Sequence, residues 1–431
     1  MTLAEGDARL ASLTARWWLV RLFLAFAIAN SLSALLRAVP ATLAPVFSLE
    51  LGLSAADLGL LSGAYFLGFA VVQLPLGSAL DRWGPRKVQQ ALLSLAVLAC
   101  LAFSQAATLP GLLWARVLMG VGMSACLMAG LTAFSHLLPA AAQLRASAWM
   151  LMTGSLGMLA STLPVQWLLP LTGWRGLFIG LAGALLLSLW LISRWVPRAL
   201  GQGLTAPDGS MPKRAVTPTG PALADRAGYR TIAKHPAFRA MAPLAFFAYG
   251  GLLAMQSLWI GPWLTQVAGQ SAASAAAGLF VVNLSMLITF LCWGWVMPHL
   301  VRRGYDGQRV IAVGWPVGIV ILAVNLWLGP GAGAWHWAAW CMATSVVTLS
   351  QPALGQAFAP ALAGRALSAF NMLIFAGVFT LQWGMGLLID GLQRHGVAPA
   401  DAVRLSVAML GLGVLFAFCW FVRARKVAGT R

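Results

Sequence analysis

The chain has 431 residues, of which 60% are hydrophobic and only 9% are charged, and its mean hydropathy is +0.83. A soluble domain carries roughly 25% charged residues, so this composition excludes a soluble globular protein and requires lipid as the solvent. The net charge of +18 does not indicate nucleic-acid binding, because the basic residues lie between apolar segments rather than on one face.

Twelve apolar segments follow one another along the chain, and each is close to the ~20 residues that a membrane-spanning helix needs. The predicted spans cover residues 18–47, 57–80, 88–108, 111–136, 145–169 and 176–194, and then 240–264, 274–298, 309–328, 335–357, 366–390 and 402–423. In lipid every backbone polar group needs a partner inside the protein, so each span should be helical. The pattern predicts an all-α membrane protein.

A polar segment rich in Pro, Gly and Ala separates spans six and seven, and it indicates a linker between two halves. We therefore expect an N-terminal six-helix bundle over 1–196, a cytoplasmic linker over 197–239 and a C-terminal six-helix bundle over 240–431. A weak internal repeat supports this division, because Arg145 opens span five as Arg365 opens span eleven. Duplicated six-span units with a substrate site between the halves are a known transporter design.

The basic residues predict the orientation of the chain. Of the 28 Lys and Arg residues, 23 lie on one set of alternate loops, and only Arg175, Arg394 and Arg404 lie on the other set. Because cytoplasmic loops carry the excess of Lys and Arg, both termini and the linker should be cytoplasmic. The expected location is a bacterial inner membrane, which the chain crosses many times.

The loop after span two carries the most specific motif of the chain, a glycine, an acid and a basic cluster at fixed spacing. Its defined positions are Gly77, Asp81, Arg82, Gly84, Arg86 and Lys87. With this loop the chain resembles the major facilitator superfamily, whose signature is G-x-x-x-D-R-x-G-x-R-K. The resemblance implies a transporter in two pseudo-symmetric bundles, in which this loop latches the halves together in the outward-facing state.

A second segment, Arg116 to Gly122 in span four, resembles the R-x-x-x-G-x-G signature of the same superfamily, whose arginine faces the interior of the N-terminal half. The chain departs from the superfamily's drug/proton antiporters in two places. Span five has Gly154 and Gly157 but lacks their Gly-Pro motif, and span one has Arg37 near the position where those antiporters tend to carry an acid. Both departures weaken a drug-efflux interpretation.

Arg37 and Arg116 are the two arginines that lie away from the ends of the predicted spans, and no Asp or Glu lies deep in any span. Intramembrane charges are costly and usually functional, and a guanidinium binds carboxylate or phosphate at two points. Our hypothesis is that the substrate is a small anion with Arg37 as its main anchor. In the alternatives, Arg116 ties helices together through backbone carbonyls, and Arg37 extends toward the outer face.

The second half offers polar and aromatic side chains rather than charges. Tyr249, Gln256, Asn371 and Gln382 are the predicted substrate-binding residues there. For each of them, helix packing through hydrogen bonds is an equally good interpretation.

No nucleotide-binding, nucleophile or metalloprotease motif is present, so we expect a secondary transporter rather than an enzyme, with no cofactor and no metal. The five cysteines lack metal-ligand spacing, and the methionines are typical of packing rather than of a Cu(I) path. The expected partners are a small-molecule substrate, a coupling ion or counter-anion, and the bilayer, and we expect a monomer. The main alternative is an exporter of drugs or other amphipathic compounds; a non-transporting scaffold is disfavoured by the intact loop motif.

Overall fold

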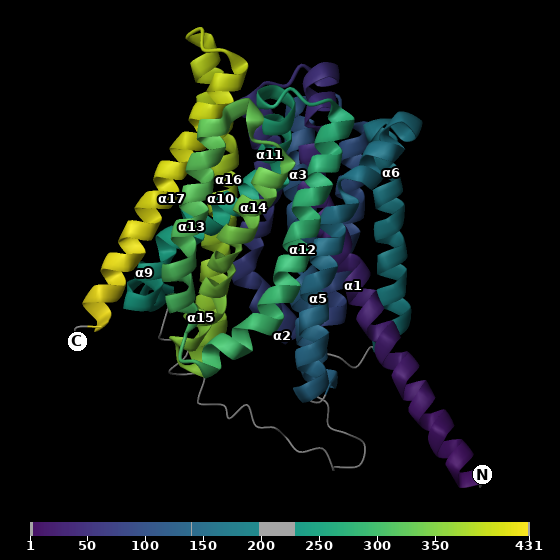
Figure 1. The fold of residues 1–431 in the computed structure, drawn as a ribbon. Coiled ribbons are helices and arrows are strands. Elements are labelled where there is room, and N and C mark those ends of the chain that lie inside the picture. Colours follow the sequence, from purple (N-terminus) through teal and green to yellow (C-terminus); the bar gives the residue numbers. More distant parts are fainter. Residues whose placement is uncertain (1–2, 139, 198–228, 430–431) are drawn as a thin grey trace.

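The computed structural model describes residues 3–138, 140–197 and 229–429, and no strand occurs among them (Figure 1). Nine helical stretches of this described part are long and apolar enough to cross a membrane. Three further spans bring the total to twelve, because the long stretch Ala55–Gln105 contains two spans and because spans five and ten are interrupted and are not among the nine. The fold is therefore the predicted all-α architecture of twelve membrane helices.

The first span belongs to a helix, α1 (Leu3–Leu51), that is longer than the predicted 18–47. The helix begins in the polar N-terminal segment and extends away from the bundle (Figure 1). It also continues through Pro40 and Pro45. A proline lacks the N–H that would bond the carbonyl four residues earlier, so α1 has gaps in its hydrogen-bond ladder in its C-terminal third.

Spans two and three form one 51-residue element, α2 (Ala55–Gln105), with a sharp reversal inside it. The reversal lies at Gly84, whose φ of 79° and ψ of 157° are not helical. Positive φ favours glycine, which explains this residue in the middle of the loop motif.

Spans four and five are each interrupted. Span four consists of α3 (Leu109–Met123) and α4 (Cys126–Leu137). Span five begins as α5 (Ala140–Ala160), earlier than predicted, and ends within α6 (Leu163–Trp195). Gly173, with a φ of 63°, then reverses the chain, and the rest of α6 is span six.

The last eleven residues of the predicted linker, 229–239, are largely helical. They form α8 (Tyr229–Lys234) and the start of α9 (Pro236–Pro243), and Ile232 packs against Ala366 and Ala369 of span eleven. The greater part of the predicted linker, 198–228, lies outside the described residues.

Span seven alternates between π-helical and α-helical turns instead of forming one regular helix. After α9 it comprises η1 (Leu244–Tyr249), α10 (Gly250–Ala254), η2 (Met255–Trp259), α11 (Ile260–Pro262) and η3 (Trp263–Val267). Pro262 lies inside the span, where α11 ends and η3 begins. π-Turns are often found at functional sites.

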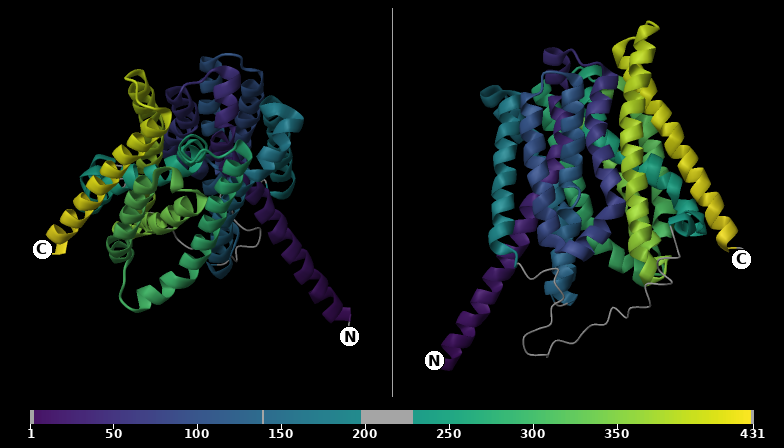
Figure 2. Two further views of the ribbon diagram at one scale, coloured as in Figure 1. Left: turned by 45° about the horizontal axis from the view of Figure 1, so that its top comes forward. Right: turned by 180° about the vertical axis from the view of Figure 1, so that it is seen from behind.

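The remaining spans follow in order. They are α12 (Ala272–Arg302), α13 (Gly307–Leu328) with a short η4 (Gly329–Gly331), the interrupted span ten of α14 (Ala334–Thr344), η5 (Ser345–Leu349) and α15 (Ser350–Gln356), then α16 (Pro360–Arg394) and α17 (Pro399–Gly429). Figure 2 shows that the first six spans and the last six lie side by side as two groups of helices.

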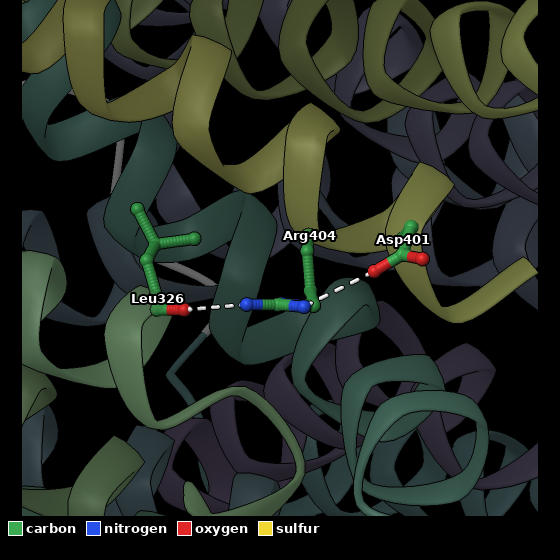
Figure 3. Close-up of polar contacts among 3 residues, drawn as sticks. All are labelled: Leu326, Asp401 and Arg404. Atoms are coloured by element: carbon green, nitrogen blue, oxygen red, sulfur yellow. Dashed lines mark hydrogen bonds and ion pairs between the residues drawn. The ribbon is translucent and has the colours of Figure 1, made fainter. Parts of the chain in front are cut away.

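Within each half, an arginine binds a carbonyl near a helix end, where carbonyls have no partner in their own helix. Arg86 donates to the carbonyl of Ser193 at 2.6 Å, joining spans three and six. Arg404 joins spans twelve and nine, because its Nη2 donates to the carbonyl of Leu326 at 3.1 Å while its Nη1 pairs with Asp401 at 3.1 Å (Figure 3). Spans nine and twelve occupy the same positions in the second half as spans three and six in the first, so equivalent spans are joined in both halves.

The two halves meet most extensively where α2 packs against α16. We call the face of the molecule opposite the two chain termini the far face. At the far-face end of the contact between α2 and α16, glycines allow the two backbones to approach closely. A Cβ at Gly59 would overlap the carbonyl of Gln382, and one at Gly386 would overlap the carbonyl of Ala55. Toward the other face, a Cβ at Gly77 would meet nothing within 4 Å. The halves are therefore packed together at the far face and not at Gly77.

Candidate functional site

The loop motif lies at the face of the molecule where the two termini lie, opposite the far face, and most of its residues are exposed. Asp81, Arg82 and Lys87 are exposed, Gly84 makes the turn, and Arg86 is buried against span six. Among the described residues, no atom lies within 4 Å of the position that a Cβ at Gly77 would take. In this conformation the contact of the motif with Ser193 lies within its own half.

Arg37 lies in the interior of the molecule, between the halves. Its guanidinium is within electrostatic reach of Tyr65 of span two, Cys126 of span four and Tyr249 of span seven. Its Nη2 also lies close to Gly154 of span five. The side chain is half-buried, but its Nε is fully buried and has no hydrogen-bond partner among the described residues. Arg37 therefore does not extend to the membrane surface, and one of its donors is unused.

A polar stripe on α1 leads to Arg37. Asn30 Nδ2 donates to the carbonyl of Met150 at 2.9 Å and to Thr153 Oγ1 at 3.1 Å. One turn later, the hydroxyl of Ser33 lies 3.0 Å from that of Tyr65. Residues three, four and seven apart share a helix face, so Asn30, Ser33 and Arg37 point the same way. Sequence reasoning missed this stripe and Tyr65, although the spacing alone could have revealed the stripe.

Arg116 is buried, with 1% of its surface exposed, and its contacts are with the backbone. Its Nη1 donates to the carbonyl of Leu36 at 2.8 Å, and its Nε donates to the carbonyl of Leu61 at 3.3 Å. The Leu36 carbonyl is the one that the N–H of residue 40 would bond in a regular helix, and residue 40 is proline. Arg116 thus fills the gap in the ladder directly before Arg37, and the ring of Tyr65 lies 5.2 Å from its Cζ.

The glycines of the second signature allow this close packing. A Cβ at Gly120 would overlap the carbonyl of Tyr65, and one at Gly122 would lie 2.6 Å from the backbone nitrogen of Ala96. These contacts hold α3 directly against α2 and bring Arg116 to span one.

Three of the four predicted residues in the second half are engaged in hydrogen bonds. Gln256 donates to Asn283 at 2.9 Å, and Gln382 donates to Ser257 at 2.9 Å. Asn371 accepts a short hydrogen bond from Gln351. Asn283 also reaches across to the first half, where its Nδ2 lies 3.3 Å from the carbonyl of Met158.

Tyr249 differs from these residues. It is half-buried, lies on the π-turn η1 and makes no side-chain hydrogen bond among the described residues. It is also the second-half residue that interacts electrostatically with Arg37. The structure therefore brings Arg37 and Tyr249 together from opposite halves, while Gln256 and Gln382 tie helices within the second half.

The acidic side chains of the described residues all lie away from Arg37. Glu50 accepts from Trp174 at 2.8 Å, Asp57 and Asp390 accept from backbone amides at the start of α2, Asp306 accepts from the amide of Arg309, and Asp401 pairs with Arg404. Asp81 is exposed in the loop motif. No group of three His, Cys, Asp or Glu comes together as a metal site in this part of the chain. Arg37 thus has no carboxylate partner among the described residues.

A family model described as the Major Facilitator Superfamily matches residues 26–381. Among solved structures, an inward-facing bacterial homologue of the human lysosomal transporter Spinster is similar to this chain, with a TM-score of 0.71, 19% identity and coverage of 95% of this chain and 97% of the other. A D-xylose–proton symporter gives a TM-score of 0.68 at 15% identity, covering 92% of this chain and 97% of its own. No curated protein sequence matches significantly.

A nucleoside transporter has the same fold, with a TM-score of 0.68 at 15% identity and coverage of 92% of this chain and 99% of the other. At such identities these structures establish the fold alone. The family model, in contrast, covers most of the chain, and it agrees with the twelve helices and with both signatures. The protein belongs to the major facilitator superfamily and is a multi-pass membrane transporter.

Proposed function

We propose that the protein is a secondary transporter of a small organic anion and that Arg37 binds the anionic group. One observation carries this proposal: Arg37 lies in the interior between the halves with a buried Nε that has no acceptor among the described residues. Burying a charge without a partner is costly. An anionic substrate removes this cost, and a planar guanidinium binds a carboxylate at two points.

Tyr249 supplies the contact from the opposite half in this proposal. A hydroxyl without a protein partner can donate to the second oxygen of a carboxylate while Arg37 holds the first. Such a substrate touches both halves at once, as alternating access between two bundles requires. Gln256, Asn371 and Gln382 are the further substrate-binding residues of the second half in this proposal. Arg116 acts as a positioning residue, because it holds the backbone next to Arg37.

The distribution of Lys and Arg supports a bacterial inner-membrane location with both termini cytoplasmic. On that orientation the far face is extracytoplasmic, and the conformation described above is inward-facing. We place the halves at 1–196 and 240–431 and treat the protein as a monomer. A fusion of alkaline phosphatase to the C-terminus should be inactive, whereas a fusion within the loop near Gly396 should be active; the reverse pattern would overturn the orientation.

The anion hypothesis is tested by binding. A thermal-shift screen of the purified protein against small carboxylates and phosphate esters should find ligands that raise the melting temperature, because binding to the folded state stabilises it. Arg37→Ala should abolish that shift and transport, and Arg37→Lys should retain part of both. Arg394→Ala, a change of the same charge at the exposed far face, serves as the control.

A variant Arg37→Ala that folds and still binds and transports with unchanged kinetics would contradict the proposal. The exporter alternative gives a different result: expression would raise the tolerance of cells to toxic amphipathic compounds, and no anion would shift the melting temperature.

A further inference from the structure

The far-face seam between α2 and α16 contains a carboxylate of one half bound to a helix N-terminus of the other. Asp390 lies in the last turns of α16. Its Oδ1 accepts from the backbone N–H of Ala55 at 3.0 Å, and its Oδ2 accepts from that of Ala56 at 3.0 Å. Ala55 and Ala56 are the first two residues of α2, where backbone N–H groups have no acceptor in their own helix.

The first half caps the same helix end only in part. Ser54 and Asp57 form a reciprocal capping box, in which Ser54 N donates to Asp57 at 3.1 Å and Asp57 N donates to Ser54 at 3.2 Å. This box leaves the N–H groups of Ala55 and Ala56 to another acceptor. The N-terminus of α2 is therefore capped by two carboxylates, of which Asp57 belongs to its own half and Asp390 to the other.

The bonds to Asp390 require the halves to be in contact. Gly386, one turn before Asp390, packs against the carbonyl of Ala55, and Gly59, one turn after Ala55, packs against the carbonyl of Gln382. The carboxylate is thus held at the α2 N-terminus by backbone contacts on both sides of the seam. When the far face opens, these contacts and both hydrogen bonds are lost together.

We propose that Asp390 is an electrostatic latch that holds the far face closed, and that its release is part of opening that face. A carboxylate at a helix N-terminus interacts favourably with the helix dipole, and charge-assisted hydrogen bonds are stronger than neutral ones. Because Asp390 and the two amides can all bind water after release, the latch changes the balance between the two states without blocking either. This inference is independent of the substrate.

The experiment measures how far the halves are apart at the far face. Spin labels on Leu171→Cys and Ala398→Cys, both exposed, report the distance by pulsed electron resonance in a background with the exposed Cys292 and Cys419 changed to Ser. Asp390→Asn should raise the ratio of open to closed far face about tenfold, which corresponds to about 1.4 kcal/mol. Asp57→Asn is the matched control, because it removes the same charge from the same helix end but breaks no contact between the halves.

A second variant tests the donor side of the latch. Ala55→Pro removes one N–H that Asp390 accepts and leaves the carboxylate in place, and proline is well tolerated at the first helical position. It should shift the distance distribution in the same direction as Asp390→Asn. Equal distributions for Asp390→Asn and Asp57→Asn, or a far face that stays fully closed in Ala55→Pro, would overturn the proposal. If Asp390→Asn does not fold, the distance distribution of Ala55→Pro alone tests whether Asp390 holds the far face closed.

Discussion

At the scale of single residues, the arginines Arg37 and Arg116 have different environments although both come from predicted spans. Arg116 donates from Nη1 and Nε to the carbonyls of Leu36 and Leu61 and leaves only its buried Nη2 without an acceptor, whereas Arg37 makes no side-chain hydrogen bond among the described residues and its Nε is buried. The difference arises from Pro40, which leaves the Leu36 carbonyl open to Arg116. One arginine thereby supports the backbone that carries the other.

We expect Arg116→Ala to lower the melting temperature by several degrees, because it leaves the buried Leu36 carbonyl, which has no helical donor at Pro40, unpaired at a cost of about 1–3 kcal/mol. The double variant Arg116→Ala with Pro40→Ala should recover part of the loss, since alanine at position 40 restores an N–H for the Leu36 carbonyl. Thermal unfolding in detergent measures both. If the double variant melted no higher than Arg116→Ala, the link between Pro40 and Arg116 would be refuted.

At the scale of elements, helices α2 and α16 pack closely along only part of their length. Gly59 packs on the backbone of α16, whereas Gly77, farther along α2, meets nothing within 4 Å. Between them the ring of Phe69 lies 4.6 Å from that of Phe375. The same pair of helices is therefore closed at one end and open at the other, as expected for one of the two states of an alternating-access carrier.

Substitutions at the two glycines should act in opposite directions. Gly59→Val overpacks the closed end and should disfavour the conformation described here by about 1–3 kcal/mol. Gly77→Val meets open space in this conformation, and by resemblance it should hinder only the state in which the loop motif joins the halves. Distances between labels at the far face should lengthen for Gly59→Val and stay short for Gly77→Val. A change of the same sign in both variants would contradict this account.

At the scale of the whole molecule, the uncompensated charge of Arg37 should make the empty carrier and the anion-loaded carrier reorient at different rates. When the halves close around an empty site, the guanidinium loses water without gaining a carboxylate, whereas a bound anion neutralises it. We therefore expect the loaded carrier to reorient faster than the empty one. This favours exchange of one anion for another, in which the counter-anion is the coupling partner.

Reconstituted vesicles can test this expectation. Uptake of a labelled anion identified by the binding screen should be at least about tenfold faster into vesicles loaded with the same unlabelled anion than into empty ones, which is about 1.4 kcal/mol in the barrier. Equal rates in loaded and empty vesicles, with binding to Arg37 intact, would reject exchange while leaving the anion site standing.

The sequence was sufficient for the fold, because membrane spans and turns depend on local properties. Long apolar segments, the reversal at Gly84 and the two signatures each occupy short stretches of chain, and they predicted twelve spans and the superfamily. The details within spans were less predictable: span five begins earlier than expected, and span seven passes through Pro262 by π-turns. Such details depend on packing against neighbouring helices rather than on hydropathy.

What the sequence alone determined was that Arg37 and Arg116 are charges within the membrane and that Asp57 and Asp390 lie near span ends. Only the tertiary structure decided what each of them contacts, because their partners are far away in the chain: 80 residues separate Arg116 from Leu36, and 335 separate Asp390 from Ala55. Hydropathy places a residue along the membrane normal, but the packing of helices selects which neighbour it meets. That selection leaves Arg37 Nε without an acceptor among the described residues and makes Asp390 a contact between the halves.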